Sequence, residues 1–271
     1  MAYVRVAQAE KYYRREDGRQ MLVLEGVSFD TKEHGITSLL GPSGCGKSTL
    51  LNVISGLERL DRGRIEFRGA SRRIRGSDAP VSPQNSALAT HDLKLGYVFQ
   101  DPRLLNWKRV EDNLTFALRG MQVPRAGWEE RLHKYLDLVG LLEFRKQYPL
   151  YLSGGMRQRV GLARGLVIEP EVLLMDEPYS KLDQLTARRL REDTLEICAR
   201  LRQTALLVTH DVEEAAYMGD RIVILSGRPA RVLEVFDNPF PPHGRDVDDA
   251  GFIEFKKKLL QSVLRFVGNT G

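Results

Sequence analysis

The sequence has little cysteine and no long hydrophobic run. Its only cysteines are Cys45 and Cys198, and Cys45 lies in a glycine-rich segment, so we do not expect a disulfide framework. No apolar run approaches the ~20 residues that cross a bilayer. The stretch 1–17 lacks the apolar core of a secretory signal. These absences favour a cytosolic protein, whose thiols remain reduced.

A large excess of one charge is also missing. Lysine and arginine number 41 against 36 aspartates and glutamates, which gives a formal net charge of +5. Basic clusters occur at 71–75 and 256–258, but no aromatic-rich sheet motif accompanies them. A mildly basic surface that tolerates nucleotides or lipid headgroups explains the charge as well. We therefore expect no nucleic-acid partner.

Short apolar segments alternate with turns in the first third of the chain. The segment 21–30 predicts a strand, and 35–40 predicts a second strand that runs directly into a glycine-rich loop at 41–49. After the loop, Leu50, Val53, Ile54 and Leu57 repeat at the spacing of a helix with one buried face. Another strand is predicted at 63–69. Strand, loop and helix thus follow in the order that a P-loop requires.

The rest of the chain divides into a helical part and an alternating part. Residues 76–92 are rich in serine, proline and alanine and predict an exposed loop. The pattern from about 101 to 157 predicts helices. Apolar strands then alternate with helices up to about 225, which predicts a parallel sheet with crossover helices. A tail at 237–271 ends in an amphipathic stretch.

The glycine-rich loop "GPSGCGKST" matches the motif G-x-x-x-x-G-K-[ST]. Its backbone N–H groups can wrap phosphates, Lys47 can bridge the β- and γ-phosphates, and the Ser48 hydroxyl can ligate Mg²⁺. An ordinary glycine-rich turn is the alternative, and the position between a strand and a helix argues against it. The expected nucleotide-binding residues are Gly41, Pro42, Ser43, Gly44, Cys45, Gly46, Lys47, Ser48 and Thr49.

Two carboxylates follow the apolar run "VLLM", at Asp176 and Glu177. Successive side chains of a strand point to opposite faces, so these carboxylates are expected to have separate tasks. Asp176 is predicted to hold Mg²⁺, and Glu177 to polarise a water against the γ-phosphate. Taken alone, two carboxylates after a strand usually mark only a solvated strand end. The P-loop in the same chain makes the catalytic interpretation the preferred one.

Four weaker signals complete this set. Gln100 ends a strand in "YVFQ", where its amide can touch the metal and the water, and His210 ends a strand in "LLVTH", where it can contact the γ-phosphate. Asp183 in "KLD" either contributes to the nucleotide site or only caps a helix. Tyr12 and Tyr13 both offer a ring to an adenine.

The segment "LSGGMRQRV" at 152–160 looks like a second anion-binding helix start. Ser153, Gly154 and Gly155 leave backbone N–H groups uncovered ahead of a helical run. A chain with a single P-loop has no evident use for a second phosphate-binding segment.

The ordered set P-loop, "YVFQ", "LSGG", "LLMDEP", "KLD" and "VTHD" resembles the ATPase subunit of an ABC transporter over about residues 3–235. The segments "LLNW", "DNLTFAL" and "THDVEEAAYMGDRIVILSGRP" resemble its bacterial nitrate, sulfonate and taurine importer branch. The resemblance implies an α/β fold, with a P-loop NTPase (RecA-like) core of mainly parallel sheet. It also implies an N-terminal antiparallel β subdomain and an inserted helical subdomain at about 101–157. The ATPase domain would span 1–236, and the tail 237–271.

The resemblance also implies a function for the "LSGG" segment. In the family, "LSGG" closes on the γ-phosphate held by a second copy, in a head-to-tail dimer with two ATP molecules at its interface. Ser153 and Gly155 would then make cross-interface contacts. Spacing within the family favours Tyr13 over Tyr12 for the adenine. The helical subdomain would receive a membrane-spanning permease, with Gln100 at its hinge, so the chain would lie peripherally on the cytoplasmic face of the inner membrane.

Several points stay open on the sequence alone. Where this importer branch usually has "FGALD", the chain has Tyr179, Ser180 and Lys181 before Leu182 and Asp183, which puts a positive charge near the expected dimer seam. An ABC ATPase acting on ribosomes or nucleic acid is the first alternative, although such proteins usually carry two ATPase halves or a coiled-coil insertion. A P-loop kinase or GTPase is the second, although neither uses "LSGG". A solute-binding protein is implied as a further partner, but the solute is not encoded here.

Overall fold

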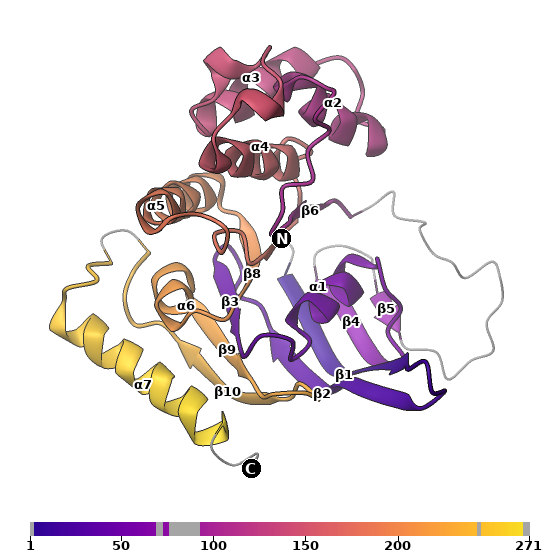
Figure 1. Cartoon of the computed structure of the whole chain (residues 1–271), viewed down its shortest axis with the longest axis vertical. Helices are drawn as coiled ribbons and strands as arrows, with labels where there is room; N and C mark the ends of the chain where they lie inside the picture. Colours follow the sequence, from indigo (N-terminus) through magenta and orange to yellow (C-terminus); the bar gives the residue numbers. More distant parts are fainter. Residues whose placement is uncertain (1–2, 69–72, 76–92, 243–244, 268–271) are drawn as a thin grey trace.

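The computed structural model describes residues 3–68, 73–75, 93–242 and 245–267 of the chain. The predicted loop at 76–92 lies outside the described residues. Two sheets, with helices packed against them, build the described part of the molecule (Figure 1). Among the described residues, no helix is both long and apolar enough to cross a membrane.

The first sheet is antiparallel and has the strand order β2-β1-β4-β5. Its strands are β1 (Tyr3–Arg14), β2 (Gln20–Asp30), β4 (Arg62–Arg68) and β5 (Arg73–Arg75). Strands β1 and β2 are joined through a short turn, and β4 pairs with the other edge of β1. This confirms the expected N-terminal antiparallel part.

The second sheet has six strands in the order β10-β9-β3-β8-β7-β6. They are β3 (Ile36–Leu40), β6 (Leu95–Val98), β7 (Val172–Asp176), β8 (Thr204–Thr209), β9 (Arg221–Leu225) and β10 (Val232–Asp237). All neighbours pair in parallel except β10, which runs antiparallel to β9. Every residue of β3 and β8 is buried, as expected for parallel strands covered on both faces. The predicted parallel sheet is confirmed.

The helix that follows the P-loop, α1 (Lys47–Ser55), lies between the two sheets (Figure 1). Its Leu50, Leu51, Val53 and Ile54 are buried in one cluster with residues of β1, β2 and β4 and of β7 and β8. The predicted helical spacing of Leu50, Val53 and Ile54 thus marks a face that is fully buried, whereas Leu57 lies beyond the helix and is 65% exposed.

The helical part forms a separate group at the β6 side of the large sheet (Figure 1). It contains α2 (Val110–Gly120), α3 (Trp128–Leu138), two 3₁₀ turns (Leu142–Phe144 and Pro149–Tyr151) and α4 (Gly154–Leu166). Its apolar residues join those of α5 (Gln184–Leu201) and the sheet in one buried cluster. Because these residues share one core, the helical group is packed directly against the large sheet.

The C-terminal helix α7 (Ala250–Val267) packs on the chain's own core beside α6 (Val212–Met218). Phe252, Phe255 and Leu259 are buried in one cluster with residues of α6 and β9. The spacing of these three residues places them on one helix face. Part of the tail is therefore an integral layer of this fold.

Candidate nucleotide site

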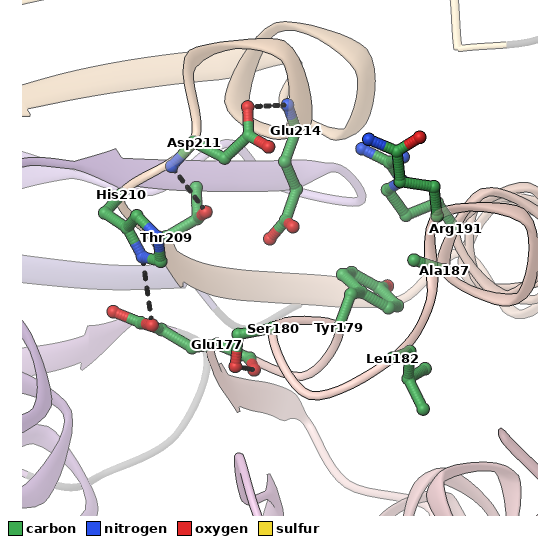
Figure 2. Close-up of a pocket in the computed structure, with 11 residues that line it drawn as sticks. Glu177, Tyr179, Ser180, Leu182, Ala187, Arg191, Thr209, His210, Asp211 and Glu214 are labelled. Atoms are coloured by element: carbon green, nitrogen blue, oxygen red, sulfur yellow. Dashed lines mark hydrogen bonds and ion pairs between the residues drawn. The ribbon is translucent and has the colours of Figure 1, made fainter. Parts of the chain in front are cut away.

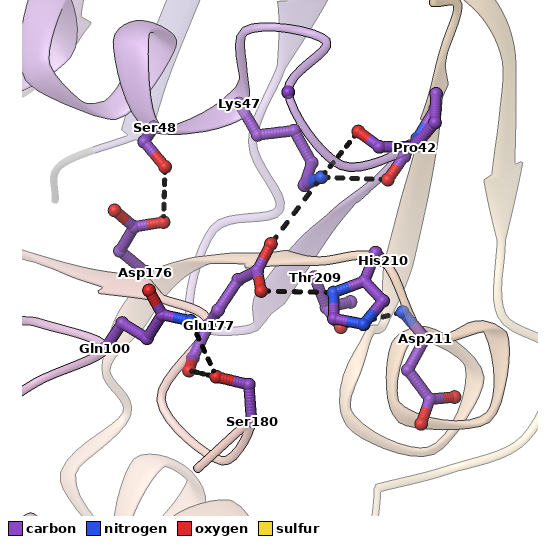
Figure 3. Close-up of polar contacts among 12 residues, drawn as sticks. Pro42, Lys47, Ser48, Gln100, Asp176, Glu177, Ser180, Thr209, His210 and Asp211 are labelled. Atoms are coloured by element: carbon purple, nitrogen blue, oxygen red, sulfur yellow. Dashed lines mark hydrogen bonds and ion pairs between the residues drawn. The ribbon is translucent and has the colours of Figure 1, made fainter.

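Four parallel strands end side by side at one edge of the large sheet, and the predicted site residues follow them. The strands β3, β8, β7 and β6 are neighbours in that order. The P-loop follows β3, His210 follows β8, and Gln100 follows β6. Asp176 is the last residue of β7, and Glu177 comes directly after it. Because parallel strands present their carboxyl ends at the same edge, residues far apart in the chain meet there. Figure 3 shows them around one space.

The P-loop turns tightly into α1. Gly44 and Gly46 adopt positive φ angles of 74° and 125°, which favour glycine. A Cβ on Gly46 would lie 3.0 Å from Val23 Cγ1 of β2, so this position is also crowded. Cys45, between the two glycines, is 2% exposed, and burial raises the pKa of its thiol. The loop therefore keeps its backbone close to the core, which leaves α1 to begin at Lys47.

Lys47 folds back over its own loop. Its Nζ donates hydrogen bonds to the carbonyl oxygens of Gly41 at 2.8 Å and Pro42 at 2.9 Å. The side chain is 4% exposed, and Nζ lies 3.6 Å from Glu177 Oε1. A buried ammonium needs such partners, and the phosphate oxygens of a nucleotide can replace them.

Asp176 and Ser48 form the oxygen-rich side of the site. The Ser48 hydroxyl donates to Asp176 Oδ1 at 2.9 Å (Figure 3). Burial raises the pKa of Asp176, while the bond from Ser48 opposes that shift. A hydroxyl and a carboxylate beside a phosphate loop are donors that suit Mg²⁺, which usually takes one or two protein oxygens and the phosphates of its substrate.

Glu177 is held in an unusual backbone conformation. Its φ of 42° lies in the left-handed region, although its N–H still donates to Val208 O at 3.0 Å, as if β7 continued. The carboxylate thereby reaches the residue that follows β8: Oε2 lies 3.0 Å from His210 Nδ1. Non-glycine residues with positive φ often occur at functional sites. Asp176 and Glu177 thus have different partners, Ser48 and His210, and their separate tasks stay a prediction.

Gln100 contacts a residue that the sequence did not mark as functional. Its Nε2 donates to Ser180 Oγ at 3.0 Å, and that hydroxyl donates to the carbonyl oxygen of Glu177 at 3.0 Å. The next residue pair is also linked, because Lys181 Nζ lies 3.4 Å from Asp101 Oδ2. Ser180 thus connects Gln100 to the backbone of Glu177, and Lys181 connects Asp101 to the same segment. Only the fold shows this link, since 80 residues separate the partners.

The neighbouring tyrosines Tyr12 and Tyr13 of β1 point in different directions. Tyr13 packs against the cluster that contains α1 and donates its hydroxyl to Glu58, which follows α1; burial raises its pKa to about 12. Tyr12 instead donates to Glu10 at 2.9 Å on its own strand. Tyr13 is therefore the tyrosine that lies on the P-loop side of the sheet.

Arg228 is a second residue that sequence reasoning missed. Its guanidinium donates to the carbonyl oxygen of Gly44 at 2.6 Å, so the turn between β9 and β10 braces the P-loop. No local pattern around Arg228 predicts this contact, because 184 residues separate the two partners.

The "LSGG" segment forms the start of α4, away from the P-loop contacts. Ser153 caps the helix by accepting the Met156 N–H at 3.3 Å, and Asp183 caps α5 by accepting the Thr186 N–H at 3.0 Å. A Cβ on Gly155 would lie only 2.5 Å from Thr186 Cγ2. Within the described residues, no hydrogen bond or ion pair links Ser153, Gly154 or Gly155 to the P-loop. The structure thus gives Gly155 a packing role that the sequence did not predict.

A phosphate loop between a strand and a helix, with carboxylates and a histidine at neighbouring strand ends, defines the class of P-loop nucleotide-binding proteins.

Comparisons with known proteins identify the family within this class. The sequence profile described as ABC transporter matches residues 24–180. The taurine import ATP-binding protein TauB of Rhizobium johnstonii is 39% identical over 258 residues, which cover 95% of this chain and 92% of the relative. The aliphatic sulfonates import ATP-binding protein SsuB 2 of Burkholderia cenocepacia is 40% identical over 244 residues, which cover 90% and 83%.

Solved structures agree with this assignment. A dimeric ATP-binding cassette, MJ0796, solved in a post-hydrolysis state with ADP and Pi, matches with a TM-score of 0.72 and 26% identity; the match covers 88% of this chain and all of the other. The cbiO1 protein of Clostridium perfringens, part of an ABC transporter complex, gives a TM-score of 0.72 at 25% identity, with 96% and 93% covered. The chain belongs to the ABC transporter family. It is an ATP-binding protein with ATPase activity and a P-loop NTPase fold.

Proposed function

We propose that this chain is the ATPase subunit of an importer that carries a small, anionic solute of the nitrate, sulfonate or taurine kind through a separate permease. The observation that carries the ATPase part is the convergence of Lys47, Glu177 and His210 at the mouth of the P-loop. The import part rests on relatives that are named as taurine and aliphatic sulfonates import proteins. None of these observations favours the alternative action on ribosomes or nucleic acid.

In this proposal Glu177 is the general base. Its contact with His210 orients the carboxylate, and its distance from Lys47 keeps it beside the place that the motif assigns to the γ-phosphate. His210 contacts both the carboxylate and the γ-phosphate, and Gln100 helps to position the attacking water. The left-handed backbone of Glu177 supports this role, because it turns the side chain toward the neighbouring strand end.

Mg²⁺ would be held by Ser48 and Asp176, which already face one another, with the amide oxygen of Gln100 as a third ligand. The bound ion would neutralise charge that develops on the phosphates. Lys47 would exchange the carbonyls of Gly41 and Pro42 for phosphate oxygens.

The remainder of the nucleotide is assigned to the loop and to β1. The backbone from Gly41 to Thr49 would wrap the phosphates, and Tyr13 would stack on the adenine. Its position on the same side as α1 supports Tyr13 rather than Tyr12.

A second copy of the chain would complete the site. Ser153 and Gly154 are exposed at the start of α4, where backbone N–H groups and the helix dipole favour an anion. The dimeric state of the solved cassette supports a head-to-tail dimer in which Ser153, Gly154, Gly155 and Asp183 face the nucleotide of the partner copy.

The helical subdomain, at about 101–157 within an ATPase domain at 1–236, would dock on the permease. Three large apolar side chains there are strongly exposed: Trp107 by 73%, Leu150 by 68% and Tyr151 by 79%. Exposed apolar groups of this size favour a protein partner. The chain would then lie peripherally on the cytoplasmic face of the membrane, with a solute-binding protein on the other side of the permease.

Uptake in cells tests this proposal. Cells that produce the complete system with the wild-type chain should accumulate radiolabelled taurine, an alkanesulfonate or nitrate, and cells with Glu177→Gln should lose that uptake. Uptake of all three solutes that is independent of this chain would overturn the import assignment while leaving the ATPase assignment standing.

A further inference from the structure

The turn between β9 and β10 reaches the P-loop through one side chain. The Arg228 guanidinium donates from Nη2 to the carbonyl oxygen of Gly44 at 2.6 Å, which is a short, charge-assisted hydrogen bond. Its other terminal nitrogen, Nη1, lies 3.6 Å from Met21 Sδ of β2. In the part of the chain that the structure describes, Arg228 forms no ion pair. The loop carbonyl is therefore the oxygen to which this cation is committed.

Contacts with β2 hold the turn in place independently of Arg228. The Ala230 N–H donates to Val23 O at 2.8 Å, and the Glu25 N–H donates to Ala230 O at 2.9 Å. Arg231 adds an ion pair with Glu25 at 2.6 Å. Because the turn is anchored in this way, it presents the Arg228 guanidinium to the P-loop from a fixed position.

The bond to Gly44 sets the direction of the next N–H group. A trans peptide joins Gly44 to Cys45, and the C=O and N–H of such a peptide point in opposite directions. Arg228 holds the carbonyl on the exposed side of the loop, so the Cys45 N–H points inward, where it donates to Pro42 O at 3.3 Å. Gly44 has a φ of 74°, and glycine adopts several backbone conformations about equally readily. This peptide therefore depends on a contact such as that with Arg228 to keep its orientation.

Two donors of the loop converge on the same oxygen. Lys47 Nζ also donates to Pro42 O, at 2.9 Å (Figure 3). The Cys45 N–H thus lies on the same side of the loop as the ammonium that the P-loop motif assigns to the nucleotide phosphates. A phosphate oxygen can replace Pro42 O as the acceptor for both groups, since a charged acceptor makes the stronger hydrogen bonds.

We propose that Arg228 is a positioning residue for the nucleotide phosphates, which holds the Gly44–Cys45 peptide so that the Cys45 N–H is directed at the bound anion. The inference rests on the proposed role of the loop backbone in wrapping the phosphates. Arg228 lies on the opposite side of this peptide from the anion, so it acts through the backbone and does not touch the phosphate.

Cysteine-selective ¹⁵N labelling of the full chain tests this role, because the chain has only two cysteines. Cys198 is buried in α5 and is the internal reference. Saturation of the wild type with ADP and Mg²⁺ should move the Cys45 amide proton downfield and leave that of Cys198 in place. In Arg228→Met, saturated in the same way, the Cys45 shift should fall by about half or more, because a misdirected N–H makes a weaker hydrogen bond.

Steady-state ATP hydrolysis separates positioning from a structural role. Arg228→Met keeps a side chain of similar length but loses its donors, so the KM for ATP should rise by about fivefold. Its kcat should stay within about twofold of the wild type, as expected when binding in the ground and transition states weakens equally. Arg228→Lys keeps the charge and one donor, and should recover most of the affinity. Arg231→Met is the matched control on the same turn, since it removes only the pair with Glu25; its KM should equal that of the wild type.

A wild-type KM together with an undiminished Cys45 shift in Arg228→Met would overturn the inference. An equal rise of KM in Arg231→Met would do the same, and so would a lower free energy of unfolding of Arg228→Met in urea, because either would give Arg228 only a structural role. If nucleotide does not shift the Cys45 amide of the wild-type chain, the proposed role of the loop backbone fails, and this inference fails with it.

Discussion

Lys47 Nζ lies 3.6 Å from Glu177 Oε1, although they are 130 positions apart in the chain. The P-loop follows β3 and Glu177 follows β7, and the single strand β8 lies between these two. The ammonium of the P-loop and the proposed general base are thus adjacent. Because Lys47 is also bonded to two loop carbonyls, ATP must exchange these contacts, which links binding of phosphate to the position of Glu177.

Tyr13→Ala is expected to weaken ATP binding by about tenfold, because an aromatic stack on a base contributes ~1–3 kcal/mol. The measurement is a fluorescence titration with a nucleotide analogue. Tyr12→Ala is the control, since Tyr12 donates to Glu10 away from α1. A loss confined to Tyr12→Ala would move the adenine site to the other side of the strand.

Gly155→Ala is expected to lower the free energy of unfolding by about 1–3 kcal/mol, because the added Cβ would lie 2.5 Å from Thr186 Cγ2. Gly154→Ala is the matched control: its Cβ would lie 3.6 Å from Leu182 Cδ2, an ordinary contact. Urea unfolding of both variants measures the difference. Thr186→Ser, which removes the crowded methyl, should restore most of the loss in the double variant. Equal stability of the two alanine variants would remove the packing role of Gly155.

Stability is expected to fall as pH rises from about 5 to 8, through Glu214. Its pKa is about 8 in the folded chain and near 4.3 when unfolded. The folded state therefore binds more protons in this window, and raising the pH favours unfolding by on the order of 1 kcal/mol per pH unit. Glu214→Gln removes this titration, so its unfolding free energy should change less between pH 6 and pH 8 in urea titrations. An unchanged pH slope in that variant would show that Glu214 is not the buried acid responsible.

The sequence predicts those parts of the site whose residues are contiguous in the chain. Strand, loop and helix around Lys47 are contiguous, so their spacing alone indicates a P-loop, and the apolar run before Asp176 indicates a buried strand end. The strand β10 was missed, because the predicted alternation ended at Leu225. Its sequence VLEVFD has no alternation of apolar and polar residues, and the neighbours Val235 and Phe236 are both apolar although Val235 is 45% exposed and Phe236 is buried.

Contacts between distant segments were not predictable in the same way. The bond from Gln100 to Ser180 depends on how the β6 and β7 ends align. A cavity lined by Tyr179, Arg191 and Glu214 depends on how α5 and α6 approach the segment after β7 (Figure 2). Arg191 and Glu214 carry no motif, since each looks like a surface residue of an amphipathic helix. Only the packed structure shows that Glu214 is buried and that Arg191 lines the same cavity.

The role of Glu177 is tested most directly by ATP hydrolysis in Glu177→Gln, which keeps the size of the side chain and removes its basicity. Hydrolysis should be at least about a hundredfold slower, while ATP still binds and dimers accumulate on a sizing column. His210→Ala should also slow hydrolysis, because it removes the partner that orients the carboxylate. Near-normal turnover by purified Glu177→Gln would contradict the account.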